Sequence, residues 1–212
     1  MGETETKVPL WGIVGGIASG KSLIADQLER LGAAVVRADE LAHEVLKLED
    51  VKTLARRRWG HAIFAGDGQI ERRALGKIVF AAPPEGPREL KYLEQLTHPK
   101  IGQLMLAQIE QMSRSPGVPA IVLDVPLLFE SGWNKVCDKT IFVDAPREVR
   151  EARALARGWS REDFASREAA QESLDDKRRL ADVTIDNSGS IESAQAQVER
   201  FWQASLGASP RK

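Results

Sequence analysis

The segment 15–22 holds the residues in this chain best suited to do chemistry. It reads Gly-Gly-Ile-Ala-Ser-Gly-Lys-Ser, which is the G-x-x-x-x-G-K-S pattern of a phosphate-binding loop. Its glycines let backbone N–H groups turn inward around phosphate oxygens, because no Cβ stands in the way. Lys21 has the reach to neutralise β- and γ-phosphates, and the Ser22 hydroxyl can ligate Mg²⁺. A glycine-rich turn that binds nothing is the alternative.

Two elements must position this loop. An apolar run at residues 10–14 precedes it, and a helical pattern at residues 22–31 follows it. Strand, glycine loop and helix in this order are the setting that the motif requires, and the helix N-terminus adds partial positive charge beside the phosphates. We therefore predict a nucleoside triphosphate site formed by Gly15, Gly16, Ile17, Ala18, Ser19, Gly20, Lys21 and Ser22.

The wider pattern predicts a three-layer α/β fold. Apolar runs without polar alternation are typical of parallel strands that are covered on both faces. Five such runs occur, at residues 10–14, 33–36, 120–125, 140–143 and 183–185. Because helical patterns separate them, we expect a five-stranded parallel sheet flanked by helices, with ligands at the carboxyl ends of the strands.

The spacing of the runs predicts the domain organisation. About 80 residues separate the second run from the third, far more than a crossover needs, and this stretch is helical in pattern. We expect turns at residues 66–68 and 83–87. The predicted division is a nucleotide-binding core at 8–39, 119–146 and 181–206, a helical substrate-binding insertion at 40–118, an arginine-rich helical lid at 147–180, and flexible termini at 1–7 and 207–212.

Composition narrows the function classes. A formal net charge of −1 over 212 residues gives no basis for nucleic acid or an anionic membrane as a partner. The single cysteine, Cys137, excludes an internal disulfide framework and fits a reducing compartment, with a small buried packing residue as its expected role. No apolar run reaches membrane length, and the first nine residues lack a signal sequence. We expect a cytoplasmic protein, monomeric or weakly homo-oligomeric.

Two acids follow predicted strands. Asp39 lies three residues past the second run, where a carboxylate can accept the proton of an attacking hydroxyl or hold Mg²⁺ through water. It also precedes a plausible helix start, so an N-cap role is an equal alternative. Asp124 near the end of the third run resembles a metal-orienting carboxylate, with a strand-end cap as the alternative.

A GTPase is the rival class, and the sequence argues against it. Segment 124–127 has no glycine where D-x-x-G requires one, and segment 134–138 is one residue too long for N-K-x-D. The arginines of residues 147–180 are either a solvated helix face or a lid that brings one or two guanidinium groups to the transferring phosphoryl group.

Several longer segments carry further patterns, at residues 14–22, 37–45, 70–80, 93–101, 125–130 and 181–189. Among them, the His-Pro element, the Pro-Leu-Leu-Phe-Glu element and the closing Ala-Asp…Asp-Asn-x-Gly element are more specific than the glycine loop. Together these segments resemble the dephospho-CoA kinase family of P-loop, nucleoside-monophosphate-kinase-like proteins, and the resemblance covers almost the whole chain.

The resemblance implies a reaction and roles for individual residues. The family transfers the γ-phosphoryl group of ATP, with Mg²⁺, to the ribose 3′-hydroxyl of dephospho-CoA, which completes coenzyme A synthesis. Asp39 falls at the family's expected catalytic base. Arg153 and Arg157 fall among its lid arginines, with Arg153 expected at the reacting phosphoryl group, and Asn187 falls in the loop that borders the adenine. The substrate side is expected to include His98, Arg72 and Leu127, although His98 alone would suggest a helix-end packing residue.

Four positions depart from the family's pattern. The family has threonine at Val14, glycine at Ala18, threonine at Leu23 and an acid at Arg37. Leu23, a position expected to border the nucleotide, loses a hydroxyl that would touch the α-phosphate. We interpret these changes as tuning nucleotide affinity, because the lysine, serine and aspartate of the expected chemistry remain. A kinase with another small-molecule acceptor and a non-catalytic nucleotide-binding regulator are the open alternatives.

Overall fold

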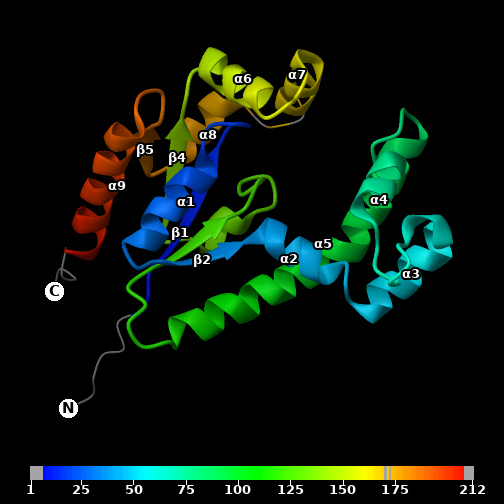
Figure 1. Ribbon diagram of the computed structural model, residues 1–212. Coiled ribbons are helices and arrows are strands. Elements are labelled where there is room, and N and C mark those ends of the chain that lie inside the picture. The colour runs from blue at the N-terminus through cyan, green and yellow to red at the C-terminus, as the bar shows by residue number, and fades with distance from the viewer. Residues whose placement is uncertain (1–6, 170, 172, 208–212) are drawn as a thin grey trace. The chain divides into compact units, whose positions relative to one another are not determined.

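A computed structural model describes residues 7–169, 171 and 173–207 (Figure 1). Residues 1–6 and 208–212 of the predicted flexible termini lie outside the described part of the chain. The chain forms two compact units. The smaller unit is Ala38–Gln108, and the larger unit holds the chain before it and after it.

The larger unit is built on one parallel sheet. In the described part of the chain the sheet has five strands in the order β2-β3-β1-β4-β5, and each neighbouring pair is parallel (Figure 1). This confirms the predicted sheet, with no strand end displaced by more than one residue. The strands are β1 (Leu10–Gly15), β2 (Ala34–Arg37), β3 (Ile121–Asp124), β4 (Lys139–Asp144) and β5 (Val183–Asp186).

One face of the sheet packs against α1 (Lys21–Arg30) and α9 (Ile191–Leu206). Side chains alternate along each strand, so Trp11 and Ile13 of β1 face this layer together. The Trp11 ring meets the ring of Phe201 from α9 edge-on, with centroids 4.8 Å apart. Gly32, two residues after α1, has φ +108°, a left-handed conformation that is typical of the glycine after a helix end.

The arginine-rich stretch forms α6 (Arg147–Ala156), α7 (Arg161–Ala169) and α8 (Leu174–Leu180) within its described residues. A short 3₁₀ helix, η2 (Trp133–Val136), leads into β4. Burial raises the pKa of the Cys137 thiol after η2 to about 12, and Asp138 and Asp182 add to this effect. The thiol therefore stays protonated, as expected for a packing residue.

The smaller unit is helical. It contains α2 (Ala38–Val45), α3 (Glu49–Trp59), the 3₁₀ helix η1 (His61–Ile63), α4 (Arg72–Val79) and most of α5 (Glu85–Ser113). Its buried core is made by small and branched apolar side chains, which are Ala55, Ile63, Ile70, Leu75 and Val79. A two-residue antiparallel bridge, Phe64 with Ile70, closes the predicted turn at residues 66–68.

Two local expectations about this unit are corrected. The predicted turn at residues 83–87 is helical from Glu85, because a proline in the first helical turn, here Pro87, needs no N–H partner. The same helix continues through Pro99 to Ser113, so His98 does not lie at a helix end. Among the described residues, no helix is both long and apolar enough to span a membrane.

Candidate functional site

The phosphate loop depends on glycine at specific points. Gly20 has φ +100° and would place a Cβ 2.1 Å from Asn187 Nδ2. A Cβ on Gly15 would lie 2.7 Å from both Ser19 Oγ and the Val143 carbonyl oxygen. Side chains are therefore disfavoured at the first and last glycines of the motif, where the backbone turns tightly between β1 and α1.

Lys21 lies over this loop. Its Nζ donates to the carbonyl oxygens of Gly15 and Gly16 at 3.1 and 3.3 Å. Ser22, the next residue of α1, is exposed. Positive potential therefore gathers at the loop. It comes from the Lys21 ammonium group, from the N-terminus of α1 and from the backbone N–H groups of the loop, and it suits an anion such as a phosphate chain.

Two side chains from distant segments meet at one carbonyl of the loop. Asn187 Nδ2 donates to the Ser19 carbonyl oxygen at 2.7 Å, and Arg153 Nη1 donates to the same atom at 3.1 Å. Arg153 Nη2 also donates to the Asn187 carbonyl oxygen at 2.8 Å. The structure thereby joins α6, the loop after β5 and the phosphate loop. Arg157, the predicted second lid arginine, ends α6 and is exposed.

Two buried cations beside this network were missed by sequence reasoning. Arg150 is 4 % exposed, and its Nε and Nη2 donate to the Ala145 carbonyl oxygen and to Glu168 Oε1 at 3.1 and 2.7 Å. Lys177 of α8 is fully buried, with Nζ 2.5 Å from Glu130 Oε1. For Arg150, one feature of the sequence could have indicated burial. It lies four residues before Ala154, which is buried, and therefore on the same face of the helix.

Asp124 closes β3 beside the loop's own strand. In the register of the sheet it lies next to Ile13 of β1 and next to Arg37 of β2. Arg37, where the family has an acid, instead bonds to two acids of α1. Its Nη2 donates to Glu29 Oε2 at 2.6 Å and to Asp26 Oδ1 at 2.9 Å. These bonds raise the pKa of Arg37 and hold the pKa of Glu29 below its usual value.

Asp39 belongs to the smaller unit and is exposed. It is the second residue of α2, which starts directly after β2. It therefore does not occupy the N-cap position. A carboxylate in the first turn is still favoured by the helix dipole, so this position by itself is compatible with both a structural and a chemical role.

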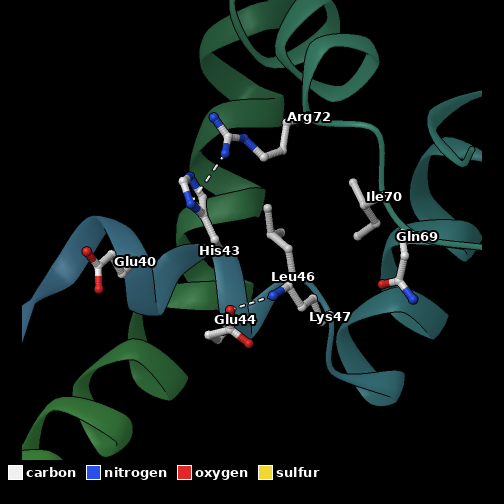
Figure 2. Close-up of a pocket in the computed structure, with 8 residues that line it drawn as sticks. All are labelled: Glu40, His43, Glu44, Leu46, Lys47, Gln69, Ile70 and Arg72. Atoms are coloured by element: carbon white, nitrogen blue, oxygen red, sulfur yellow. Dashed lines mark hydrogen bonds and ion pairs between the residues drawn. The ribbon is translucent and has the colours of Figure 1, made fainter.

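A pocket of about 690 Å³ opens in the same unit (Figure 2). His43 of α2 and Arg72 of α4 point toward each other across it, with Nδ1 and Nη1 3.3 Å apart. Leu46 and Ile70 give it apolar carbon surface, and Lys47 adds a second cation at its edge. Most of the lining is polar or charged, since Glu40, Glu44 and Gln69 also contribute to it, and Lys47 is paired with Glu44 at 2.5 Å. A concave pocket with several convergent polar groups suits a small, charged molecule.

The two remaining predicted substrate residues lie elsewhere in the chain. His98 is exposed on α5 of the smaller unit. Leu127 is 43 % exposed and follows β3 in the larger unit. The structure places Arg72 in the pocket, and it does not place either of these two residues among the residues that line it.

A family model and curated relatives identify one family. The family model for dephospho-CoA kinase matches residues 10–193. A dephospho-CoA kinase of Symbiobacterium thermophilum is 44 % identical over 198 residues, which are 92 % of this chain and 81 % of the relative. TT1252 from Thermus thermophilus is 36 % identical, with a TM-score of 0.76 over 95 % of this chain and 98 % of its own.

The fold is shared more widely than the sequence. A dephospho-CoA kinase from Campylobacter jejuni has a TM-score of 0.67 at 24 % identity, covering 94 % of this chain and 98 % of its own. The extent of the family match and the relatives' identity decide the assignment. This chain belongs to the dephospho-CoA kinase family, whose members are ATP-using kinases that complete coenzyme A biosynthesis.

Proposed function

We propose that this chain transfers the γ-phosphoryl group of ATP to the ribose 3′-hydroxyl of dephospho-CoA, with the phosphate loop as donor site. The observation that carries this proposal is the set of bonds around the loop. Lys21 lies over it, and Arg153 and Asn187 both hold the Ser19 carbonyl. A loop fixed in this way presents its N–H groups to a phosphate chain without further ordering, which is the main requirement for phosphoryl transfer.

On the donor side, Lys21 neutralises charge on the β- and γ-phosphates, and the backbone of segment 15–22 with the adjoining Leu23 surrounds the phosphate chain. Arg153 and Asn187 shape the edge of this site, since their bonds to the loop and to each other join it to the segment after β5. Arg157 at the end of α6 supplies an exposed guanidinium for the nucleotide. Each terminal nitrogen of Arg153 keeps a second N–H besides its bond to a carbonyl, and we assign this guanidinium to the reacting phosphoryl group after lid closure.

The donor set also suits Mg²⁺. Among the described residues, no group of three or more His, Cys, Asp or Glu side chains is arranged to hold a metal. Mg²⁺ in kinases needs no such cage, because phosphate oxygens and waters fill most of its positions. The Ser22 hydroxyl at the start of α1 and the Asp124 carboxylate at the end of β3 are oxygen donors of the required kind. When bound, the ion would neutralise charge on the phosphates.

On the acceptor side, we assign dephospho-CoA to the pocket of the smaller unit. Arg72 and Lys47 suit the pyrophosphate of the acceptor, and Leu46 and Ile70 suit its apolar parts. Asp39 accepts the proton of the 3′-hydroxyl as that oxygen attacks the γ-phosphorus. His98 and Leu127 complete the contacts to the acceptor in this proposal. In this proposal the core binds ATP, the helical insertion binds dephospho-CoA, and α6–α8 form the lid.

The test is ADP production from Mg-ATP with dephospho-CoA, beside AMP, pantetheine phosphate and no acceptor. We expect turnover with dephospho-CoA alone, and phosphate on the 3′-oxygen of the product by ³¹P NMR. Equal turnover with AMP would indicate a nucleoside monophosphate kinase instead. ATP binding without turnover on any acceptor would favour a regulator, and the positions to revert would then be Val14, Ala18, Leu23 and Arg37.

A further inference from the structure

Arg150 carries a donor that the protein itself does not use. Its guanidinium is 4 % exposed, and two of its three nitrogens are bonded, Nε to the Ala145 carbonyl and Nη2 to Glu168. Its Nη1 is buried and has no hydrogen-bond partner among the described residues. A buried charged N–H without an acceptor is costly, and natural proteins keep such a group mainly where a ligand or water supplies the acceptor.

This spare donor faces the phosphate loop. A Cβ built on Gly16 would lie 3.1 Å from Arg150 Nη1, so the nitrogen lies directly beside the loop backbone. The same Cβ would lie 3.1 Å from both terminal carbons of Leu174. Arginine and leucine side chains thus both contact the loop at Gly16, and a larger residue there would have to displace them by a few tenths of an ångström.

The local charge balance also favours an anion. Glu168 is shared, because Arg147 Nε donates to its Oε2 at 2.9 Å while Arg150 Nη2 donates to its Oε1. Arg147 also pairs with Glu151, at 3.2 Å, and Glu151 pairs with Arg161 as well. Three guanidinium groups thus share two carboxylates, and the cluster retains a net positive charge beside the loop. By contrast, both terminal nitrogens of Arg153 are bonded to backbone carbonyls. Arg150 has the donor that remains to be satisfied.

We propose that Arg150 is a nucleotide-binding residue whose Nη1 donates to the β-phosphate held in the loop, while Glu168 and the Ala145 carbonyl fix its guanidinium. This rests on the proposed ATP site and adds a residue to it. Guanidinium suits phosphate because it is always charged and its donors lie in one plane, and a charge-assisted hydrogen bond in a buried site is among the strong ones.

The test compares Arg150→Gln with Arg147→Gln. Both changes remove one arginine from Glu168, and only the first removes the donor beside Gly16. We expect Arg150→Gln to raise the dissociation constants of ATP and ADP by about 10- to 100-fold, with AMP, which lacks the β-phosphate, changed less than threefold. Arg147→Gln should leave all three within threefold. Isothermal titration without acceptor gives these constants.

Two further variants separate binding from structure. Glu168→Gln keeps the spare donor and weakens one of the two contacts that fix the guanidinium, so we expect a lower melting temperature and a loss of ATP affinity smaller than that of Arg150→Gln. Arg150→Lys keeps the charge and loses the planar set of donors, so its ATP affinity should fall between those of wild type and Arg150→Gln; it also serves if the glutamine variant does not fold. Equal losses in Arg150→Gln and Glu168→Gln, or equal losses for AMP and ATP, would overturn the proposal.

The nucleotide-binding measurements on the Arg150 variants do not depend on whether dephospho-CoA is the acceptor. If wild-type protein binds ATP and does not phosphorylate dephospho-CoA, the proposed function fails while the Arg150 comparison still stands. If it does phosphorylate dephospho-CoA and Arg150→Gln binds ADP normally, the Arg150 proposal alone fails.

Discussion

Arg153 and Asn187 lie 34 positions apart in the chain, and they bond to each other as well as to the loop. Arg153 Nη2 donates to the Asn187 carbonyl oxygen at 2.8 Å, while Nη1 of Arg153 and Nδ2 of Asn187 share the Ser19 carbonyl oxygen as acceptor. The three groups form a closed ring of hydrogen bonds. Because Asn187 is 2 % exposed, this ring is protected from water and should stabilise the loop strongly.

Gly20 is the position where this ring leaves least room. We predict that Gly20→Ala raises the ATP dissociation constant at least tenfold, because its Cβ would meet Asn187 Nδ2 at 2.1 Å and force that amide away from Ser19. Positive φ alone costs alanine about 1–2 kcal/mol. Isothermal titration with ATP and thermal melting measure the two effects separately.

Gly132 provides the matched control for this change. It has φ +76° in the same unit, and no described atom lies within 4 Å of a Cβ built there. Gly132→Ala should therefore lower stability by about 1 kcal/mol and leave ATP affinity within twofold. If the two alanine variants bind ATP equally well, the contact with Asn187 does not shape the site.

Asp39 is the residue that distinguishes a kinase from a nucleotide-binding protein. We predict that Asp39→Asn lowers kcat by about 10²–10⁴-fold, the usual effect of removing a general base, with ATP affinity nearly unchanged. Asp67→Asn makes the same charge change at an exposed turn of the same unit and should leave kcat within twofold. A normal kcat in Asp39→Asn would leave this acid with a structural role in the first turn of α2.

The buried pair of Lys177 and Glu130 joins α8 to the loop after β3. Lys177 is fully buried, and its Nζ lies 2.5 Å from Glu130 Oε1. Removing the lysine alone takes this cation away from the Glu130 carboxylate, whose side chain is only 19 % exposed. Breaking a buried pair on one side costs about 3–5 kcal/mol. We predict such a loss for Lys177→Met in urea unfolding, and a smaller loss for the double variant Lys177→Met with Glu130→Gln. Additive losses would show that the two side chains are not coupled.

The sequence was sufficient for the sheet because its central strands are buried on both faces. Such strands are continuous apolar runs that can be recognised without knowing their neighbours, and the ends of β1 and β4 lie within one residue of the runs that predicted them. The phosphate loop was recognisable for a similar reason. Its glycines are needed because the local backbone leaves no room for a Cβ, and that requirement is visible in the sequence itself. By contrast, the region around Pro87 was misassigned, because proline is compatible with both a turn and a first helical turn.

The buried cations could not be predicted because their burial depends on distant partners. Arg150 is held by Glu168, 18 positions away, and Lys177 by Glu130. A local pattern of alternating charges suggests a solvated face for both. Arg37 is a similar case. It stands where the family has an acid, and nothing near it in the sequence indicates that it bonds to Asp26 and Glu29 of α1. Such contacts are decided by packing of the whole unit.

Glu89 gives the smaller unit a pH dependence. Its carboxylate is 7 % exposed and accepts hydrogen bonds from Arg58 at 2.7 and 2.8 Å, from Trp59 at 2.9 Å and from Arg88 at 3.0 Å. These donors, Arg58 above all, hold the pKa of Glu89 at about 2. An unfolded glutamate has a pKa of about 4.3, so the charged form is favoured by folding. Its contribution to stability is full above that value and is lost as the pH falls toward 2.

We therefore predict that Glu89→Gln lowers the melting temperature at pH 7 and that the difference from wild type shrinks between pH 5 and pH 2.5. The amide still accepts from one donor and cannot balance the charge of Arg58. Glu94→Gln, an exposed change on the same helix, should track the wild type at every pH. Circular dichroism melts over this pH range give the comparison. A constant difference between Glu89→Gln and wild type would mean that Glu89 acts by packing rather than by its charge.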